Sequence, residues 1–580
     1  MKALTGASLC LLLASSCADD FLEQENTYEL SQQSYFDSDD AANSAALPLY
    51  NYVWYNFNDK FYYGMGDGRA NNITAQYSNY IFPYTNFTET SLSAGLTDAW
   101  GAFYSVVAQA NNTINNLLNY SSGVSDDVKR QVIAEARFMR GLAYWYIGSL
   151  WGVAIVYENT DDMVNNYVVA PAPLADVMEF SIRDIEYAAA NLPSTSATLG
   201  RVNKYAAYGL LSRVYLSMAG LVLGNEAYDQ TNAASESDFN RGVRNTYYLN
   251  LAKKAALKVI DESSYSLMPT YASLFAAETF NNNQESLFQL QWEAGTAVNG
   301  NAQSMTRFLA WSAMVADQNA WGGATYCSYD LWEEFKEYSD KNLGETVDDA
   351  VRRHYCIASY GESYPELSTD PTDPYIYGET ESPGNQGANI KKYVIGTKKV
   401  NGFSEPNNSG VNTYMLRLAE VYLNYTEAVL GNDESTTDVE YFNKLRTRAQ
   451  VPTKSSVSYE DIRHERRVEF AFEGLYWFDL VRRSYYEEQE VINYVNSQHR
   501  NASYFSSSTN TYELSDSWTY PGSNVSIATA INLTLPMDDT DQTKNPLLKP
   551  TSADASQMRQ YATVPISFGE KEVSVEDLFK

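Results

Sequence analysis

The sequence predicts a mainly α fold, a tetratricopeptide-like helical repeat scaffold with long irregular insertions and a few short strands. Three observations predict it. Amphipathic stretches with an apolar residue every three or four positions recur through the first half of the chain. Similar stretches return near residues 414–483. Between them, residues from about 265 to 410 lack this period and are rich in Asn, Gly, Tyr, Trp and Pro.

The helices of the first half follow one another closely. One stretch, "LTDAWGAFYSVVAQANNTINNLLN", begins at Leu96. The next begins at Asp126, where Ser125 is the expected N-cap and the acidic first turn suits the helix dipole. After a short β-like run, "VAIVYE", come three more: "LADVMEFSIRDIEYAAANL", "NKYAAYGLLSRVYLSMAGL" and "LNLAKKAALKVIDES". Helix pairs of this length resemble tetratricopeptide units with a period of about 34 residues. We expect degenerate repeats over about residues 96–262.

The second half is expected to hold loops and then helices. "SLFQLQWE" is the one strand-like run among loop-rich insertions over about 60–95 and 265–410. Repeat helices are expected again over about 411–486, including a charged helix at 462–483 in which Gly474 suits close helix packing. From about Glu487 the chain is expected to be irregular.

The N-terminus reads as an export signal. Lys2 precedes an apolar run that ends in small residues directly before Cys17, and about 20 apolar residues would be needed to span a bilayer. The arrangement resembles a lipoprotein lipobox, with residues 1–16 removed and Cys17 acylated. Acyl chains attach a protein to a membrane because each buried CH2 contributes roughly 0.8 kcal/mol. We expect residues 17–580 to form a single domain.

Composition excludes several partners. The formal charge of −31 disfavours nucleic acid, since phosphate binding requires Lys and Arg, and it disfavours docking on anionic headgroups. The three histidines, His354, His464 and His499, lack the spacing of a zinc site. We therefore expect no metal and no cofactor. Cys327 and Cys356 can form one disulfide or stay as two buried thiols.

Tyrosine is unusually frequent. The chain holds 47 Tyr, with ten Trp and 23 Phe. A tyrosine tolerates half-wet surfaces because its ring is apolar and its tip is polar. Such residues beside many Asn and Ser are typical of surfaces that bind sugars.

Several segments, in order, carry a resemblance to a known family. "RLAEVYLNYTEA" at 417–428 and "IRHERRVEFAFEGLYWFDLVRR" at 462–483 resemble signature helices of the SusD/RagB family of outer-membrane nutrient-binding lipoproteins. "AWGAFYSVVAQANNTI" and "AEARFMRGLAYWYIGSLWGVAIV" resemble its repeat helices, and "CADDFLE" resembles its mature start. "LPMDDTDQTKNPLLKP" at 535–550 is similar to its C-terminal segment, although "PMDD" replaces the more usual Pro-Ile-Pro.

The resemblance implies a function. Members are surface lipoproteins that sit over a SusC-like TonB-dependent transporter, bind oligosaccharides without cutting them and deliver them to it. An outer-membrane, lipid-anchored protein facing outward is therefore expected. The resemblance leaves peptide capture by the same groove as the second candidate function.

Candidate glycan-binding residues combine ring faces with polar side chains aimed at hydroxyls. They lie in residues 63–87 and 299–326, insertions that the resemblance places near the binding face. Trp321, before Gly322 and Gly323, is expected to be exposed, whereas tryptophans on repeat helices are expected in the core. The candidates are Asp67, Arg69, Asn71, Asn72, Tyr77, Tyr80, Tyr84, Asn301, Gln303, Trp311, Trp321 and Tyr326.

Two other classes of protein stay open. A glycoside hydrolase requires two carboxylates about 5–10 Å apart across a sugar, and Glu465, Glu469, Glu473 and Asp479 are close in sequence. With 72 acidic residues such groupings arise freely, so we expect these acids to pair with Arg466, Arg467 and Arg482 and lock helices together. A structural adaptor built on helical repeats is the other alternative.

Overall fold

The structure is a computed structural model. The described residues are 36–75, 80–230, 239–294, 303, 305–311, 314, 325–336, 338–340, 345–368, 370, 372–378, 387–394, 409–514, 528–552 and 560–580. The expected signal peptide, residues 1–16, and the expected lipidation site, Cys17, lie outside them.

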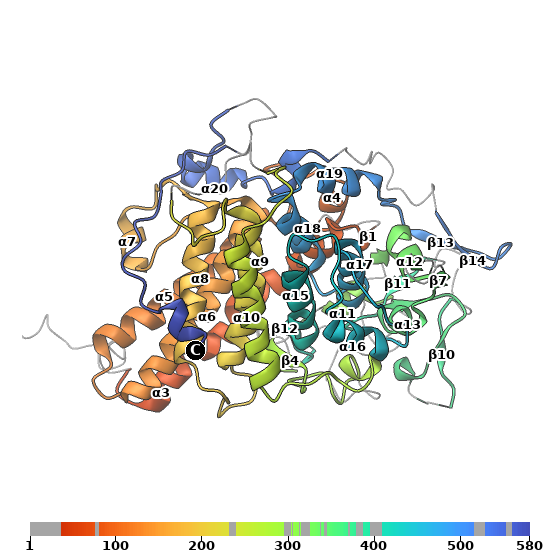
Figure 1. Ribbon diagram of the computed structural model, residues 1–580, viewed down its shortest axis with the longest axis horizontal. Helices are drawn as coiled ribbons and strands as arrows, with labels where there is room; N and C mark the ends of the chain where they lie inside the picture. Colours follow the sequence, from red (N-terminus) through yellow and green to blue (C-terminus); the bar gives the residue numbers. More distant parts are fainter. Residues whose placement is uncertain are drawn as a thin grey trace, which may run out of the picture.

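A row of long helices forms one half of the molecule (Figure 1). Neighbours in the row pack on each other in the order in which they follow in the chain. The mainly α fold with paired, tetratricopeptide-like helices is confirmed. The row consists of α5 (Leu96–Tyr120), α6 (Asp126–Trp151), α8 (Leu174–Asn191), α9 (Lys204–Leu221), α10 (Thr246–Glu262) and α15 (Leu418–Leu430).

Small residues let these helices approach closely. A Cβ on Gly141 of α6 would lie 2.8 Å from the Ile185 side chain of α8. At the same contact the Ser181 hydroxyl donates to the Gly141 carbonyl at 2.7 Å. Ser125 is the N-cap residue of α6, as expected, but its side chain makes no hydrogen bond to the helix. Its hydroxyl and N–H instead donate to the carboxylate of Asp39 in α3 (Asp39–Ala45).

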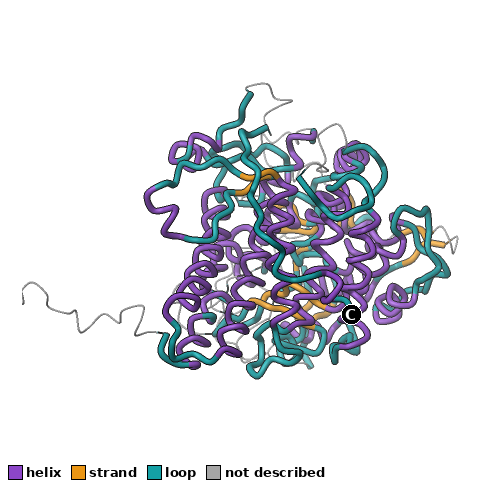
Figure 2. Tube along the Cα trace, turned by 60° about the vertical axis from the view of Figure 1, so that its left-hand side comes forward, coloured by secondary structure: helices purple, strands orange, loops and turns teal. Residues whose placement is uncertain are grey.

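Most of the short strands lie in the other half, towards the right of Figure 1, and Figure 2 shows them in orange. The strand expected at "SLFQLQWE" is β4 (Ser286–Leu290), which pairs antiparallel with β12 (Thr413–Arg417). A four-stranded antiparallel sheet has the order β1 (Ile73–Ala75), β5 (Thr325–Cys327), β11 (Asn389–Ile390), β8 (Ile357–Ala358). Two-stranded pairs are β2 (Val153–Ala154) with β3 (Ala172–Pro173), β6 (Tyr338–Asp340) with β7 (Glu345–Val347), β9 (Ser363–Tyr364) with β10 (Tyr375–Ile376), and β13 (Ser503–Ser506) with β14 (Thr511–Leu514).

The charged segment at 462–483 is two helices, so the expectation of one helix is wrong. α17 (Tyr459–Glu469) and α18 (Tyr476–Ser484) are separated by a turn. Phe472 and Gly474 in this turn have φ of 65° and 69°, outside helical geometry. Both turn N–H groups donate to Asp67, a residue some 400 positions away in sequence, at 3.0 and 2.6 Å.

The expectation of irregular chain after Glu487 is also wrong in part, because α19 and the β13–β14 hairpin follow it. The remaining short helices lie around the row and the sheet. They are α4 (Phe82–Thr85), α7 (Thr160–Asn165), α11 (Met305–Leu309), α12 (Tyr329–Lys336), α13 (Ala350–Cys356), α16 (Glu440–Arg448), α19 (Glu488–Ser497), α20 (Asp539–Lys544) and α21 (Val575–Leu578), with 3₁₀ or π turns η2 (Leu47–Tyr50), η3 (Tyr52–Trp54), η4 (Phe57–Phe61), η5 (Gly64–Gly68), η7 (Ala272–Leu274), η9 (Pro365–Leu367), η12 (Ala530–Leu533) and η13 (Pro546–Leu548).

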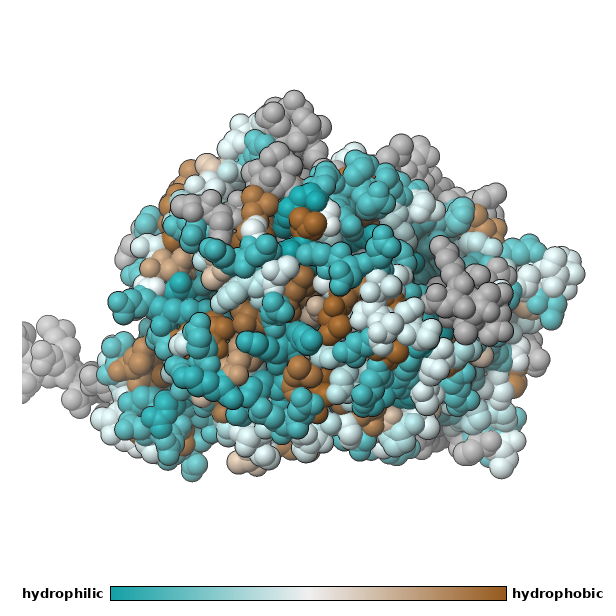
Figure 3. Space-filling model, viewed as in Figure 1, coloured by the Kyte–Doolittle hydropathy of each residue, from teal (hydrophilic) through white to brown (hydrophobic). Residues whose placement is uncertain are grey.

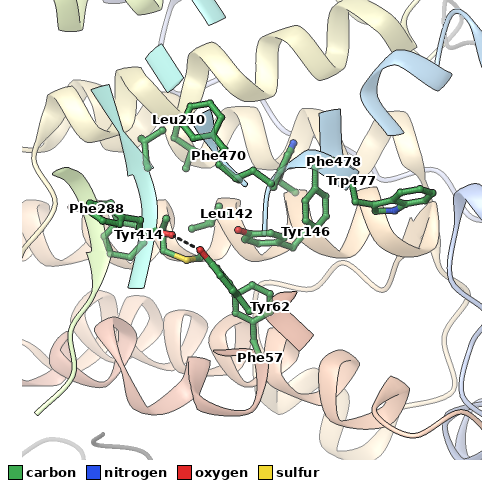
Figure 4. Packing of buried hydrophobic residues seen from close by; sticks show 14 of the residues in the cluster. Phe57, Tyr62, Leu142, Tyr146, Leu210, Phe288, Tyr414, Phe470, Trp477 and Phe478 are labelled. Atoms are coloured by element: carbon green, nitrogen blue, oxygen red, sulfur yellow. Dashed lines mark hydrogen bonds between the residues drawn. The ribbon is translucent and has the colours of Figure 1, made fainter. Parts of the chain in front are cut away.

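One hydrophobic cluster connects the two halves, with members from Phe36 to Leu578. Figure 4 shows aromatic rings from the N-terminal segment, α6, β4, β12 and α18 meeting in it, and Tyr62 donating to the Tyr414 carbonyl at 3.2 Å. Trp100, Trp145 and Trp151 are buried on the repeat helices, as expected.

The face of the molecule seen in Figure 3 is mostly hydrophilic, with scattered hydrophobic residues. No helix among the described residues is long and apolar enough to cross a membrane.

A buried ionic network holds the strands against the late helices. The guanidinium of Arg417 donates to Glu285, Glu469 and Glu473 at 2.6–2.9 Å. All four side chains are at most 1% exposed. Removing one partner of such a set leaves an uncompensated charge in the core, which is strongly destabilising.

We expect Arg417→Met to lower the free energy of unfolding by about 3–5 kcal/mol, because three buried glutamates lose their shared cation. Urea unfolding followed by circular dichroism measures the change. The control is Lys258→Met, which removes an ion pair with Glu262 in which the glutamate is 42% exposed. The free energy of unfolding of that variant should fall by about 0.5 kcal/mol or less. Equal losses for the two variants would contradict the role of the network.

Candidate functional site

The two segments singled out from the sequence meet in the four-stranded sheet. β1 belongs to the segment 63–87 and β5 to the segment 299–326, and the strands pair with Thr74 opposite Tyr326. Asn389 of β11 fixes the chain beside them: its side chain accepts from the Trp311 N–H at 3.0 Å and donates to the Thr325 carbonyl at 2.8 Å. Two segments far apart in sequence are thus joined in one sheet.

Three aromatic side chains in this region are partly exposed. They are Tyr80, Phe308 and Trp311. Phe308 lies against the buried Tyr63, with ring centroids 6.0 Å apart and planes inclined by 47°. The backbone carbonyl of Tyr80 lies against the next residue, Gly64, and its ring lies against Gly95. We call these three partly exposed aromatic side chains, which lie on the segments that carry β1 and β5, the ring surface.

Seven predicted binding residues are enclosed instead. Each is at most 4% exposed, so none offers a ring face or a hydrogen-bonding atom to a ligand in this conformation, and the expectation of direct glycan contact is corrected for them. These residues are Asp67, Arg69, Asn71, Asn72, Tyr84, Gln303 and Tyr326. Tyr77, Asn301 and Trp321 lie outside the described residues.

Asp67 ties the segment 64–72 to the turn between α17 and α18. Its carboxylate accepts from the Asn72 amide at 2.8 Å, in addition to the N–H groups of Phe472 and Gly474. Burial raises the pKa of Asp67 to about 6, although these donors and the Lys392 charge favour the ionised form. Asp67 therefore acts as a structural residue that holds the segment 64–72 against this turn.

The neighbouring polar residues also bond within the protein. Arg69 donates to Glu89 and to the Asn532 carbonyl, and its guanidinium lies 4.6 Å from the centre of the Trp477 ring. Asn71 donates to the His499 carbonyl at 3.1 Å, and Asn72 accepts from Arg467 at 3.0 Å. These bonds hold the loop that carries β1.

Tyr84 and Gln303 fix the loops on either side. The Tyr84 hydroxyl donates to the Ala94 carbonyl at 2.8 Å. The Gln303 amide donates to the Val411 carbonyl at 2.8 Å. Both side chains therefore fix loops within the protein, a role that residue type alone does not distinguish from ligand binding.

The acidic residues considered for catalysis are buried and paired. Arg466 donates to Asp479 at 2.7 Å, Arg482 donates to Glu427 at 2.6 Å, and Arg467 pairs with Glu334. The predicted pairing is confirmed for Asp479, which pairs with Arg466 and Arg482. It is wrong for the three glutamates, which pair with other cations: Glu465 with Arg352, and Glu469 and Glu473 with Arg417.

The glutamates of α17 and the following turn are equally enclosed. Glu465, Glu469 and Glu473 are at most 2% exposed. Burial would raise the pKa of Glu469, but Arg448, Arg417 and Arg352 outweigh it and hold that pKa well below its usual range. None of these carboxylates has the solvent access that a sugar-cleaving acid requires.

Cys327 and Cys356 are free thiols, and both are buried. Burial raises the pKa of Cys327 and of Cys356, so neither favours the reactive thiolate. Within the described part of the chain, no group of three His, Cys, Asp or Glu could hold a metal ion.

Sequence reasoning missed Asn389 and Phe308. Asn389 bonds to Trp311 and Thr325 only because β11 pairs with β5, and no local motif signals that pairing. Phe308 lies inside a stretch already singled out, two residues after Thr306 in α11. Its aromatic side chain is the feature by which the sequence could have predicted it as a binding residue.

Gly66 brings η5 against the turn between α17 and α18. A Cβ on Gly66 would overlap the carbonyl and Cα of Gly474. Gly474 in turn lies against Tyr62, where a Cβ would be 2.9 Å from the Tyr62 carbonyl oxygen. The close approach of the two chain segments, and with it the position of Asp67, depends on both glycines.

The fold and the site together define a helical-repeat protein that carries a partly exposed aromatic surface on an insertion. Residues 284–552 match the model of the SusD family, and residues 20–216 match a model described as starch-binding, associating with outer membrane. The chain belongs to the SusD family.

Individual relatives agree with this assignment. A SusD-like protein of Bacteroides ovatus is 34% identical over 94% of this chain and 97% of its own length. The starch-binding protein SusD of Bacteroides thetaiotaomicron is 25% identical over 63% of this chain and 67% of its own. A crystal structure with xylogluco-oligosaccharide superposes with a TM-score of 0.77 at 32% identity, covering 91% of this chain and all of that one.

We expect Gly66→Ala to lower the free energy of unfolding by about 1–3 kcal/mol, because the added methyl group has no space against the Gly474 backbone. Chemical unfolding measures it. The control, Gly101→Ala, adds the same group in the middle of α5, where nothing lies within 4 Å. The free energy of unfolding of that variant should rise by about 0.5–1 kcal/mol, because Ala has a higher helix propensity than Gly. A Gly66→Ala protein as stable as Gly101→Ala would contradict the packing described.

Proposed function

We propose that this protein is a cell-surface lipoprotein that binds oligosaccharides or polysaccharides without cleaving them. It then delivers them to a SusC-like TonB-dependent outer-membrane transporter. The observation that carries the proposal is the partly exposed ring surface at the junction of two insertions, in a chain of the SusD family. The relatives' names support the ligand class, since one is a starch-binding protein and one structure contains a xylogluco-oligosaccharide.

Trp311, Tyr80 and Phe308 are the residues proposed to contact the glycan. The CH faces of a sugar ring pack on aromatic faces. Amphipathic rings tolerate the partly solvent-exposed position that a glycan site requires. The Asn389 bond to the Trp311 backbone and the buried polar anchors below it keep the ring surface in place before ligand arrives.

A binding function without hydrolysis follows from the state of the acids. Glu465 and Glu469 of α17 and Asp479 of α18 are buried in ion pairs, and the pKa of Glu469 lies far from the raised value that a general acid needs. Capture of a peptide is the second candidate function, since partly exposed rings also accept apolar side chains.

Attachment to the outer membrane is proposed to occur through acylated Cys17. The name of one matching family model associates its members with the outer membrane. The net charge of −31 disfavours attachment by a basic patch on anionic lipids, which leaves a lipid anchor as the simpler means.

We expect Trp311→Ala to weaken glycan binding about tenfold, because a sugar ring loses the indole face on which it stacks. Isothermal titration against xylogluco-, malto- and other plant, host and microbial oligosaccharides measures the loss. Tyr167→Ala is the control, since this tyrosine is 58% exposed and follows α7, away from the sheet.

The same titration separates the alternatives. Binding heat with peptides, together with no binding heat from any glycan, would contradict glycan binding and support peptide capture. Reducing ends released from a bound glycan over hours would support a hydrolase.

We expect Cys17→Ala to move the protein from the outer-membrane fraction to the soluble fraction, because the acylated side chain is lost. Cell fractionation and intact-mass measurement check this, with co-purification of the neighbouring transporter as a further readout. Cys10→Ala is the matched control, since Cys10 lies in the segment expected to be removed. A native protein that retains residues 1–16 with Cys17 unmodified would refute the anchor.

A further inference from the structure

A second pocket is lined by residues of β4 and of the segment that leads into it, and it includes none of the residues of the ring surface. It has a volume of about 200 Å³ and is formed by three chain segments: 194–205 before and at the start of α9, 264–265 after α10, and 282–289 leading into β4. None of its lining residues belongs to the sheet of β1, β5, β11 and β8.

The pocket is neutral in a strongly acidic protein. Of its 17 lining residues, eight carry a hydroxyl, four carry an amide, and Arg201 alone is charged. That charge is balanced inside the protein, where Arg201 donates to Glu135 at 2.9 Å and to Asn43 at 3.0 Å. Such a lining suits a neutral ligand with many hydroxyl groups and offers no counter-charge to an ion.

The pocket also has apolar walls of the kind that sugars use. The rings of Tyr205 and Tyr265 are partly buried in its lining, and the Tyr265 hydroxyl accepts from the Asn203 amide at 2.9 Å. Leu199, also in the lining, is 79% exposed, the largest exposure among the bulky apolar side chains of the described residues. A pyranose ring has apolar CH faces, which match the tyrosine rings and Leu199, and a polar edge, which matches the hydroxyl and amide groups of the lining.

The walls are fixed without a ligand. The Lys204 N–H donates to the Pro193 carbonyl at 3.0 Å and closes the loop between them. Gly200, with φ of 88°, lies so close to Gln291 that a Cβ would be 2.6 Å from the amide oxygen. Asn282 and Gln291 exchange two amide hydrogen bonds of 2.7 and 2.9 Å below it. A preformed pocket spares the ordering cost that weakens ligand binding.

We propose that this pocket is a second carbohydrate subsite, which takes one neutral pyranose residue at the end or on a branch of a glycan. Its volume is below the range of about 300–1,000 Å³ found for pockets that hold drug-sized molecules, which suits a single ring. The inference rests on the proposed glycan-binding function but concerns a different surface, so the two can fail separately.

The test uses the full chain with xylogluco- and malto-oligosaccharides and follows hydrogen exchange by mass spectrometry, together with titration calorimetry. We expect either sugar to slow exchange in residues 194–205 and 282–289. Ser264→Trp fills the mouth of the pocket from an exposed position. It should abolish that protection and weaken binding there about tenfold. Ser266→Trp, an equally exposed serine outside the lining, is the matched control and should behave as wild type.

The outcomes separate the two proposals. Protection of 194–205 that survives Trp311→Ala and is lost in Ser264→Trp supports a separate subsite. Protection confined to 305–311 overturns the subsite and leaves the proposed function intact. Protection by uronic-acid oligosaccharides alone overturns the neutral ligand class. No protection by any sugar, with both variants folded as judged by melting temperature, overturns both proposals.

Discussion

The buried contact between Arg417 and the glutamates 285, 469 and 473 is the constraint on which the rest of the structure depends. It joins the end of β12, the turn before β4, and the end of α17 at one point in the core. Charges taken out of water are costly unless they are paired with good geometry. Because each partner comes from a different element, only one arrangement of strands and late helices satisfies all of them.

The position of the ring surface follows from this arrangement. Once α17 and its following turn are fixed, the turn N–H groups bind Asp67, and Asp67 fixes the loop that leads into β1. β1 then pairs with β5, and β11 holds the backbone of Trp311. Polar residues that resemble sugar contacts in the sequence are used as supports. A few rings are left partly exposed on a rigid frame, which is an arrangement suited to binding without chemistry.

The ring surface and the pocket beside β4 have different chemistry. The first offers aromatic faces, and the second offers hydroxyl and amide groups around a ring-sized space. Two subsites on one glycan chain raise the effective concentration at the second site once the first is occupied. A protein proposed to capture polymers and pass them to a transporter gains retention in this way without very tight binding at either subsite.

The sequence alone determined the helical scaffold, the strand at 286–290, the family, and the pairing of Asp479 with Arg466 and Arg482, because periodicity and residue type report local structure and charge balance. Only the tertiary structure decided the break in 462–483 and the enclosure of Asp67. The reason is physical: the break exists because Asp67 binds the turn, and Asp67 is buried because that turn covers it. Such mutual contacts across 400 residues have no signature in either segment by itself.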